Sequence, residues 1–249
     1  MSALPEGLDQ RFLDFIGVTE ESERLAHHYY LQFFKPGQKV VDLGCGAGYF
    51  VKMLREQGVE AWGIDNDLIA IKRAKEQDLP ITHAEALGYL KKLPENDLDA
   101  VFSAHLVEHL EVETVYELIK ETYRVLKPGG FLVLTTPNVH ALVSHLDLFW
   151  LHFDHKRFYH PRLLEFFMKD CQFGQVICGD NVYDQKYFHV LNRIASQHQK
   201  GFDLGLAISR LQYFLLQPWQ RFKKRLAQLI IPPKSVGRSF EVYVIGYKD

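Results

Sequence analysis

The sequence predicts an α/β protein with a doubly wound, mostly parallel sheet. Between residues 36 and 138, short apolar runs alternate with amphipathic segments that have helical periodicity. This alternation gives a parallel sheet covered by helices, with ligands bound at the carboxyl ends of the strands. With 249 residues, of which 47 % are hydrophobic, the chain is long enough to bury such a core.

Composition and charge narrow the class of protein. The net charge is only -2, so we do not expect a partner that is a polyanion such as nucleic acid. Cys45, Cys171 and Cys178 have no C-x-x-C spacing, which indicates a reducing compartment and no zinc site. Residues 1–17 lack a signal-peptide pattern, and no apolar stretch reaches the roughly 20 residues that span a bilayer. We therefore expect a cytoplasmic protein.

The first elements lead into a glycine-rich turn. Thr19, followed by acids, is expected to start a helix that runs to about Phe34 and stops at a Pro-Gly pair. The apolar run 40–43 is the first strand, and the amphipathic segment 49–56 is a helix. Glycines between them can adopt positive φ and let a ligand approach the backbone, while the helix N-terminus attracts a polar or anionic group.

The remaining elements follow by the same alternation. Later strands are predicted at 61–64, 81–83, 98–103, 131–136, 173–179 and 239–247, with helices at 68–77, 113–125 and 161–170. The second strand runs directly into Asp65-Asn66-Asp67, where a carboxylate can accept from both hydroxyls of a ribose. Asp65 is the better candidate for that role, because Asp67 is better placed to cap the following helix.

The glycine spacing resembles that of a known family. A dinucleotide turn reads G-x-G-x-x-G, whereas residues 42–48 read D-x-G-x-G-x-G. This pattern is similar to motif I of the class I S-adenosylmethionine-dependent methyltransferases. G-I-D at 63–65, V-E-H-L at 107–110 and R-V-L-K-P-G-G-F-L-V-L-T-T-P-N at 124–138 follow in the order of that family. The pattern H-x-R-x-Y at 155–159 resembles its type 11/23-like branch, which acts on small molecules and lipid precursors.

The resemblance implies a Rossmann-like sheet of seven strands with an antiparallel last strand, in a single domain over 1–249. Residues 1–35 would form an N-terminal helical lid, 36–179 the core with the cofactor site, and 238–249 the last strand. Phe12, Phe15 and Ile16 either serve in that lid or pack on the core. Residues 180–237 are too long for a hairpin loop and are predicted to form a helical, basic insertion before the last strand.

The resemblance also implies the cofactor S-adenosyl-L-methionine, with S-adenosyl-L-homocysteine as product. Gly44, Gly46 and Gly48 would hold its methionine end, Asp42 would orient its amino group, and Asp65 would bind its ribose.

Further residues are expected at the cofactor on the same basis. Glu85 would meet the adenine amino group, or else is a solvated loop acid. The others are Cys45, Asn66, Ala86, Ser103 and His105.

Three histidines are candidates for a general base, which a hydroxyl acceptor would need. They are His105, His109 and His155, and the sequence does not rank them. His105 and His109 have the i, i+4 spacing of a zinc helix, but the H-E order and a third ligand are missing, so we expect no metal. His155 and Arg157 are substrate-side candidates by resemblance; alternatively, the neighbouring aromatics pack and the charges hold the loop.

The sequence therefore predicts O-methylation of a small, lipid-linked or saccharide acceptor. The alternatives are an RNA or protein methyltransferase and a non-catalytic cofactor-binding protein in a biosynthetic complex. The segment after the fourth strand lacks the N/D-P-P-Y/F pattern of amino-methylating enzymes that act on DNA or RNA. Residues 206–238 combine an apolar stripe with basic residues and no acids. This pattern predicts peripheral contact with an anionic membrane, contact with an anionic substrate, or a homodimer interface. Alternatively, the stripe covers the active site or packs on the domain itself.

Overall fold

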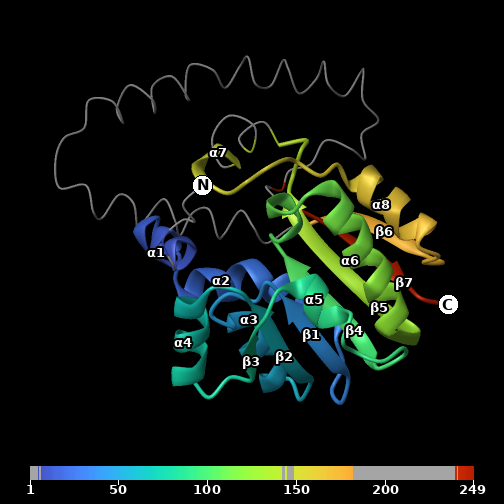
Figure 1. The fold of residues 1–249 in the computed structure, drawn as a ribbon, viewed down its shortest axis with the longest axis horizontal. Coiled ribbons are helices and arrows are strands. Elements are labelled where there is room, and N and C mark those ends of the chain that lie inside the picture. The colour runs from blue at the N-terminus through green and yellow to red at the C-terminus, as the bar shows by residue number, and fades with distance from the viewer. Residues whose placement is uncertain (1–4, 6, 142–143, 145–148, 182–238, 240) are drawn as a thin grey trace.

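A computed structural model describes residues 5, 7–141, 144, 149–181, 239 and 241–249. Its described strands form one sheet with the order β3-β2-β1-β4-β5-β7-β6 (Figure 1). β1 to β5 run parallel, and β7 is antiparallel to both of its neighbours, β5 and β6. The bounds are β1 Lys39–Leu43, β2 Glu60–Asp65, β3 Ile81–His83, β4 Leu98–Ala104, β5 Leu126–Pro137, β6 Val176–Asp180 and β7 Glu241–Tyr247. The predicted fold class, including the antiparallel last strand, is confirmed.

Helices cover both faces of the sheet. Side chains alternate along each strand, so that Val41 and Val101 face one helical layer while Val40 and Phe102 face the other. The first layer holds α5 (Ala86–Leu90), α6 (Val112–Val125) and α8 (Pro161–Asp170), which lie together in Figure 1. The second holds the 3-10 helix η1 (His28–Phe33) and α3 (Tyr49–Glu56). The remaining helices are α1 (Leu8–Phe15), α2 (Glu20–His27), α4 (Leu68–Glu76), η2 (Val107–His109) and α7 (Phe149–Leu151).

The predicted helix from Thr19 to Phe34 is wrong in its second half. Thr19 does cap α2, since its side chain accepts from the Ser22 N–H and Ser22 bonds back to the Thr19 N–H. After His27 the chain tightens into η1, which buries Tyr30 completely against the second core layer. Tertiary packing of this aromatic segment therefore overrides the helical periodicity. The short helices α5 and α7 were not predicted, and α1 lies within residues 1–35, which were predicted to be helical without bounds for this element.

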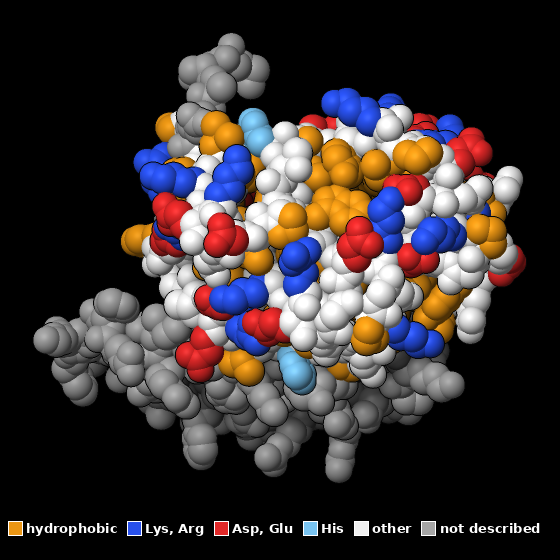
Figure 2. Space-filling view, turned by 90° about the horizontal axis from the view of Figure 1, so that it is seen from below, with side chains coloured by type: hydrophobic (Ala, Val, Ile, Leu, Met, Phe, Trp, Pro, Cys, Tyr) orange, Lys and Arg blue, Asp and Glu red, His pale blue; other side chains and the backbone are white. Residues whose placement is uncertain are grey.

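Two further features bear on the environment of the protein. Among the described residues, no helix combines the length and apolar character needed to cross a membrane. On the face shown in Figure 2, acidic and basic side chains are interspersed among apolar ones. The predicted insertion lies almost wholly outside the described residues, as do residues 206–238. The helical insertion and its contact with a membrane, a substrate or a second subunit therefore stay predictions.

Candidate functional site

A cleft of about 340 Å³ opens where the strand order reverses, between β1 and β4. In open α/β sheets, ligands bind outside the carboxyl ends of the strands at this switch point, and the volume suits a small molecule. One end of the cleft is formed by the turn after β1 and the end of β2. The other end is formed by α1, α7 and the loops that follow β4 and α7.

Glycine is needed at two positions of the turn for different reasons. Gly46 has φ of 53°, and a Cβ built there would meet nothing within 4 Å, so its backbone is open to a ligand in the cleft. Gly48 has φ of 79°, and a Cβ there would lie 2.3 Å from Ile81 Cδ1. Gly46 thus permits close approach of a ligand, whereas Gly48 permits packing of the turn against β3.

Asp65 lies beside this turn at the end of β2. Its Oδ2 accepts from the Gly46 N–H at 2.7 Å, and its Oδ1 accepts from the Asp67 N–H at 2.7 Å. A carboxylate retains further lone pairs after two such bonds, so Asp65 can still accept from ligand hydroxyls in the cleft. Asp67 caps α4, with bonds of 2.7 and 3.1 Å from the N–H groups of Ile69 and Ala70, as predicted.

Asp42 is a buried acid on the wall of the cleft, only 3 % exposed. Within the described part of the chain, no group donates a hydrogen bond to its carboxylate. Burial raises the pKa of Asp42 well above its usual range, and the charges of Asp65 and Glu23 add to this effect. A cationic group in the cleft would stabilise the ionised form of Asp42, so the site fits a ligand with an ammonium group.

The other predicted cofactor residues divide into two groups. Cys45 and Gly44 line the cleft. Ser103 instead donates to the Leu43 carbonyl at 3.0 Å and is buried, while Glu85 caps α5 through the N–H groups of Leu87 and Gly88. Neither of these, nor Asn66, Gly48 or Ala86, contributes to the lining of the cleft.

His105 is held between two buried acids. Its Nδ1 lies 3.0 Å from Glu108 Oε1, and its Nε2 lies 2.5 Å from Glu241 Oε2. Burial lowers the pKa of His105, but the hydrogen bonds to both acids raise it more, so the net pKa lies well above the usual range. With both nitrogens donating, the ring is a cation and has no lone pair with which to accept a proton. His105 is therefore poorly suited to be the base.

The prediction that His105 and His109 lie on one face of a helix is wrong. β4 extends to Ala104, His105 has a left-handed backbone with φ of 50°, and the helical turn that follows covers only Val107–His109. The two rings consequently point to different partners, His105 to Glu108 and Glu241, and His109 to the loop after α7.

Glu241 is a buried acid beside His105 that the sequence analysis did not single out. In addition to His105, its carboxylate accepts from the hydroxyls of Tyr30 and Thr135 and from the Asn181 amide. Burial raises the pKa of Glu241, but these hydrogen bonds, led by that of His105, leave the net pKa lowered. The signal in the sequence was an acid that opens an otherwise apolar strand, which indicates a buried and paired charge.

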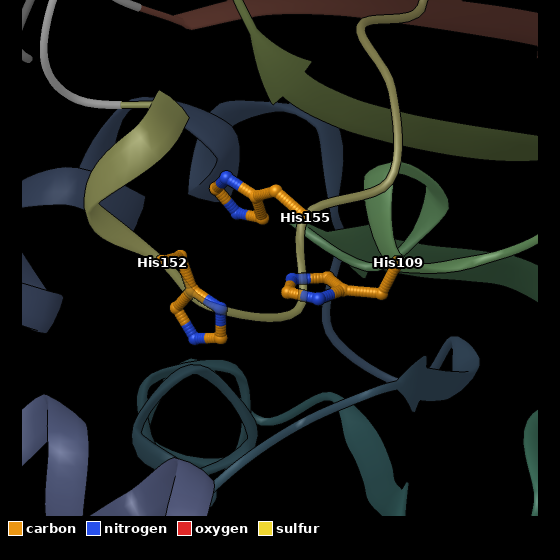
Figure 3. A group of neighbouring side chains, drawn as sticks. All are labelled: His109, His152 and His155. Carbon is orange, nitrogen blue, oxygen red and sulfur yellow. The ribbon is translucent and has the colours of Figure 1, made fainter.

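His109, His152 and His155 form a second group on the wall of the cleft (Figure 3). Their ring centroids are 4.7 to 4.8 Å apart. His155 Nδ1 donates to the Phe149 carbonyl at 2.7 Å, which leaves a lone pair on Nε2. Burial is the main cause that lowers the pKa of His155 to about 4, so this ring is neutral at physiological pH.

The loop after α7 places its two predicted substrate residues differently. His155 lines the cleft, whereas the Arg157 guanidinium lies over the Tyr159 ring at 5.0 Å and is not part of the lining. Arg157 therefore holds the loop in this structure.

Apolar side chains complete the same end of the cleft. Phe12 and Ile16 of the N-terminal segment line it, while Phe15 is 86 % exposed and does not. Leu13, Val18 and Leu151 extend this apolar surface.

Comparison with known proteins finds similarity over the core of the chain. Residues 41–134 match a family described as a methyltransferase domain. A protein of Mycolicibacterium smegmatis named as a probable S-adenosylmethionine-dependent methyltransferase is 32 % identical over 120 residues, which cover 47 % of this chain and 42 % of that protein. Malonyl-[acyl-carrier protein] O-methyltransferase of Serratia marcescens is 31 % identical over 103 residues, which cover 41 % of this chain and 39 % of that protein. The chain thus spans less than half the length of these curated relatives.

A solved structure extends the likeness of fold to nearly the whole chain. The structure of an S-adenosylmethionine-dependent methyltransferase from Archaeoglobus fulgidus matches with a TM-score of 0.71 at 23 % identity, covering 96 % of this chain and 99 % of that one.

Proposed function

We propose that the protein transfers a methyl group from S-adenosylmethionine to a hydroxyl of a small, lipid-linked or saccharide acceptor. Residues 41–134 match a family described as a methyltransferase domain, and a relative is named as a probable S-adenosylmethionine-dependent methyltransferase. The observation that carries this proposal is the two-ended cleft. Asp42, Asp65 and an open glycine backbone form one end. The other end combines apolar side chains with the neutral His155, and it also holds acids that are paired with histidines.

The acidic end suits the cofactor. Asp42 is expected to accept from its ammonium group and Asp65 from its ribose hydroxyls, while the bare backbone of Gly46 lets it lie close. S-adenosylmethionine supplies a methyl group on a positively charged sulfonium, and S-adenosylhomocysteine is the neutral thioether that remains after transfer to the acceptor oxygen.

The charge of the cleft also favours a cationic ligand. His105 as an imidazolium and the carboxylates of Glu108 and Glu241 together carry a net charge of -1. Because the two acids are buried, this charge is weakly screened and acts on the adjoining cleft. His105 then serves as a fixed charge that orients the two acids.

The apolar end suits the acceptor. Phe12, Ile16 and Leu151 can bury a hydrocarbon part of it. His155 presents the Nε2 lone pair to the same space and is placed to take the hydroxyl proton as the acceptor oxygen forms its bond to the methyl carbon.

The test is to find where the methyl group goes. The full chain is incubated with methyl-labelled S-adenosylmethionine and a cell extract, and the products are separated into organic-soluble, small polar, nucleic-acid and protein fractions. We expect label in the organic or small polar fraction with the wild type. We expect none with Asp42→Asn, in which the side chain keeps its shape but cannot carry a negative charge. Label in nucleic acid or protein would contradict the proposal, as would cofactor binding without any transfer.

A further inference from the structure

We propose that His109, His152 and His155 bind a divalent transition-metal ion, with Zn²⁺ as the best match, on the acceptor side of the cleft. Each ring offers one nitrogen, and these three atoms all lie within 4.8 Å of one another. Figure 3 shows the rings gathered around one space, from η2 and from the loop after α7. Three protein ligands with a fourth position left open are typical of a catalytic zinc site.

The ligand type selects the metal. Imidazole nitrogen suits Zn²⁺, Cu²⁺ and Ni²⁺, whereas Mg²⁺ and Ca²⁺ prefer oxygen. With Zn–N distances of about 2.0–2.1 Å, the nitrogens around one tetrahedral ion lie about 3.3 Å apart. The rings must therefore move inward by about 1 Å each, which rotation about the side-chain torsions supplies.

Each ring has an oxygen partner outside the cluster. His155 Nδ1 donates to the Phe149 carbonyl at 2.7 Å, His152 Nε2 lies 2.8 Å from Asp9 Oδ1, and His109 Nδ1 lies 3.5 Å from Asp154 Oδ2. His152 Nδ1 also accepts from the Asp154 N–H at 3.3 Å, a bond that an ion at this nitrogen would replace. Metal-binding histidines characteristically have a carboxylate or carbonyl of this kind, which fixes the orientation of the ring. The two carboxylates also offset the double positive charge of the ion.

His109 belongs to this set and not to one with His105. Both nitrogens of His105 are engaged by carboxylates, those of Glu108 and Glu241, so a metal ion could bind that ring only by displacing a charged hydrogen bond. The ligands that His109 lacked in its own sequence segment come from residues 152 and 155.

The position of the cluster suggests what the ion does. All three histidines and Asp9 line the cleft, so the open coordination position faces the acceptor end. With the ion bound, the His155 Nε2 lone pair is a ligand and cannot take the proton of the acceptor. The proton of an acceptor hydroxyl bound to the ion would pass to solvent instead, because a divalent ion lowers the pKa of a bound hydroxyl. This catalytic consequence rests on the proposed function, whereas the binding of the metal does not.

The experiment measures metal binding without using activity. The full chain is stripped with a chelator, dialysed and titrated with Co²⁺, whose visible absorption reports four-coordinate binding; Zn²⁺ is then added as a competitor. We expect one ion per chain, displaced by Zn²⁺ but not by Mg²⁺. His152→Ala and His155→Ala should each weaken Co²⁺ binding by at least tenfold, and Asp9→Asn by about 10- to 100-fold.

The control is His160→Asn. His160 lies outside the cluster and caps α8 by accepting from the Arg162 N–H, a role that asparagine can retain. This variant should bind Co²⁺ as the wild type does. Circular dichroism and thermal melting show that each variant is folded. The inference is overturned if the wild type binds no stoichiometric Co²⁺, or if folded His152→Ala and His155→Ala bind it unchanged. Calorimetry with S-adenosylmethionine on the same samples tests the proposed function separately. If the chain binds the metal but not the cofactor, the proposed function is refuted and the metal site stands.

Discussion

The two ends of the cleft are built in different ways. The acidic end comes from one stretch of chain, residues 42–65, in which β1, the glycine turn, α3 and β2 follow one another. Backbone bonds hold it, since the N–H groups of Gly44 and Cys45 both donate to the Ile64 carbonyl, at 2.8 and 3.1 Å. The acceptor end instead joins side chains that are far apart in sequence, such as Asp9 with His152 and His105 with Glu241.

This difference teaches how the fold separates its tasks. The acidic end is fixed by strand pairing, so it is as stable as the sheet that carries it. The acceptor end depends on individual side chains in loops, which can change without altering the sheet. Substitutions should therefore divide into those that abolish cofactor binding without unfolding and those that alter local stability or acceptor chemistry.

The largest effect is expected for Asp65→Ala, which attacks the acidic end. The loss of two hydrogen bonds from a charged acceptor should weaken S-adenosylmethionine binding by about 3 kcal/mol, or more than about 100-fold. The chain should stay folded, because Asp65 lies at the rim of the sheet and not in its apolar core. Calorimetry measures the affinity, with Asp67→Asn as the control, because asparagine can keep the cap of α4. Unchanged affinity in folded Asp65→Ala would remove Asp65 from the site.

A smaller effect, on stability, is expected for Glu241→Gln at the acceptor end. Removing one of the two carboxylates that hold His105 should lower the free energy of unfolding by about 2 kcal/mol near pH 6. The exposed Glu56, which pairs with Arg24, provides the control, and Glu56→Gln should change stability by less than about 0.5 kcal/mol.

The pH dependence of this effect follows from the directions of the pKa shifts. The pKa of folded His105 is raised above its ordinary value of 6.5, so its contribution is complete below that pH and is lost as the pH rises through the raised pKa. The pKa of folded Glu241 is lowered from 4.5, so its contribution is present above that pH and is lost as the pH falls through the lowered pKa. The difference in the free energy of unfolding between wild type and Glu241→Gln should thus be largest between pH 4.5 and 6.5. Urea unfolding at a series of pH values measures it. A difference that does not shrink as the pH rises through the raised pKa of His105 would contradict a charged His105.

The same contrast explains what the sequence could predict. The strands, the glycine turn, the cleft position of Asp65 and the capping role of Asp67 were predictable, because each depends on neighbours within a few residues. The start of α8 at Pro161 was predictable for the same reason, since proline fits the first turn of a helix.

The contacts that the sequence did not predict mostly join residues that are far apart along the chain. Glu241 meets His105 across 136 residues, and His152 meets Asp9 at the far end of the chain, so no local spacing could have revealed either contact. The roles of Glu85 and Ser103 at the cofactor stay predictions, and in this structure both side chains bond to nearby backbone groups. The helical reading of His105 and His109 failed because β4 and a left-handed residue occupy the start of that segment.

The smallest effects are expected for two glycine substitutions, which together test whether glycine is needed at the acidic end for contact with a ligand or for its backbone conformation. Gly46 and Gly37 have φ of 53° and 79°, and a Cβ at either would meet nothing within 4 Å. Gly46→Ala and Gly37→Ala should therefore each lower the stability by a similar amount, about 1 kcal/mol, because both force an alanine into the left-handed region.

Gly46 and Gly37 differ in whether they line the cleft. The methyl group added at Gly46 projects into the cleft, whereas Gly37 is not part of its lining. We expect Gly46→Ala to weaken S-adenosylmethionine binding by about tenfold, or 1.4 kcal/mol, and Gly37→Ala to leave it unchanged. Melting temperature and calorimetry on the matched pair give both quantities. Equal loss of affinity in the two variants would mean that strain, and not contact with the ligand, explains the requirement for glycine, and Gly46 would then resemble Gly48 as a residue selected for the turn itself.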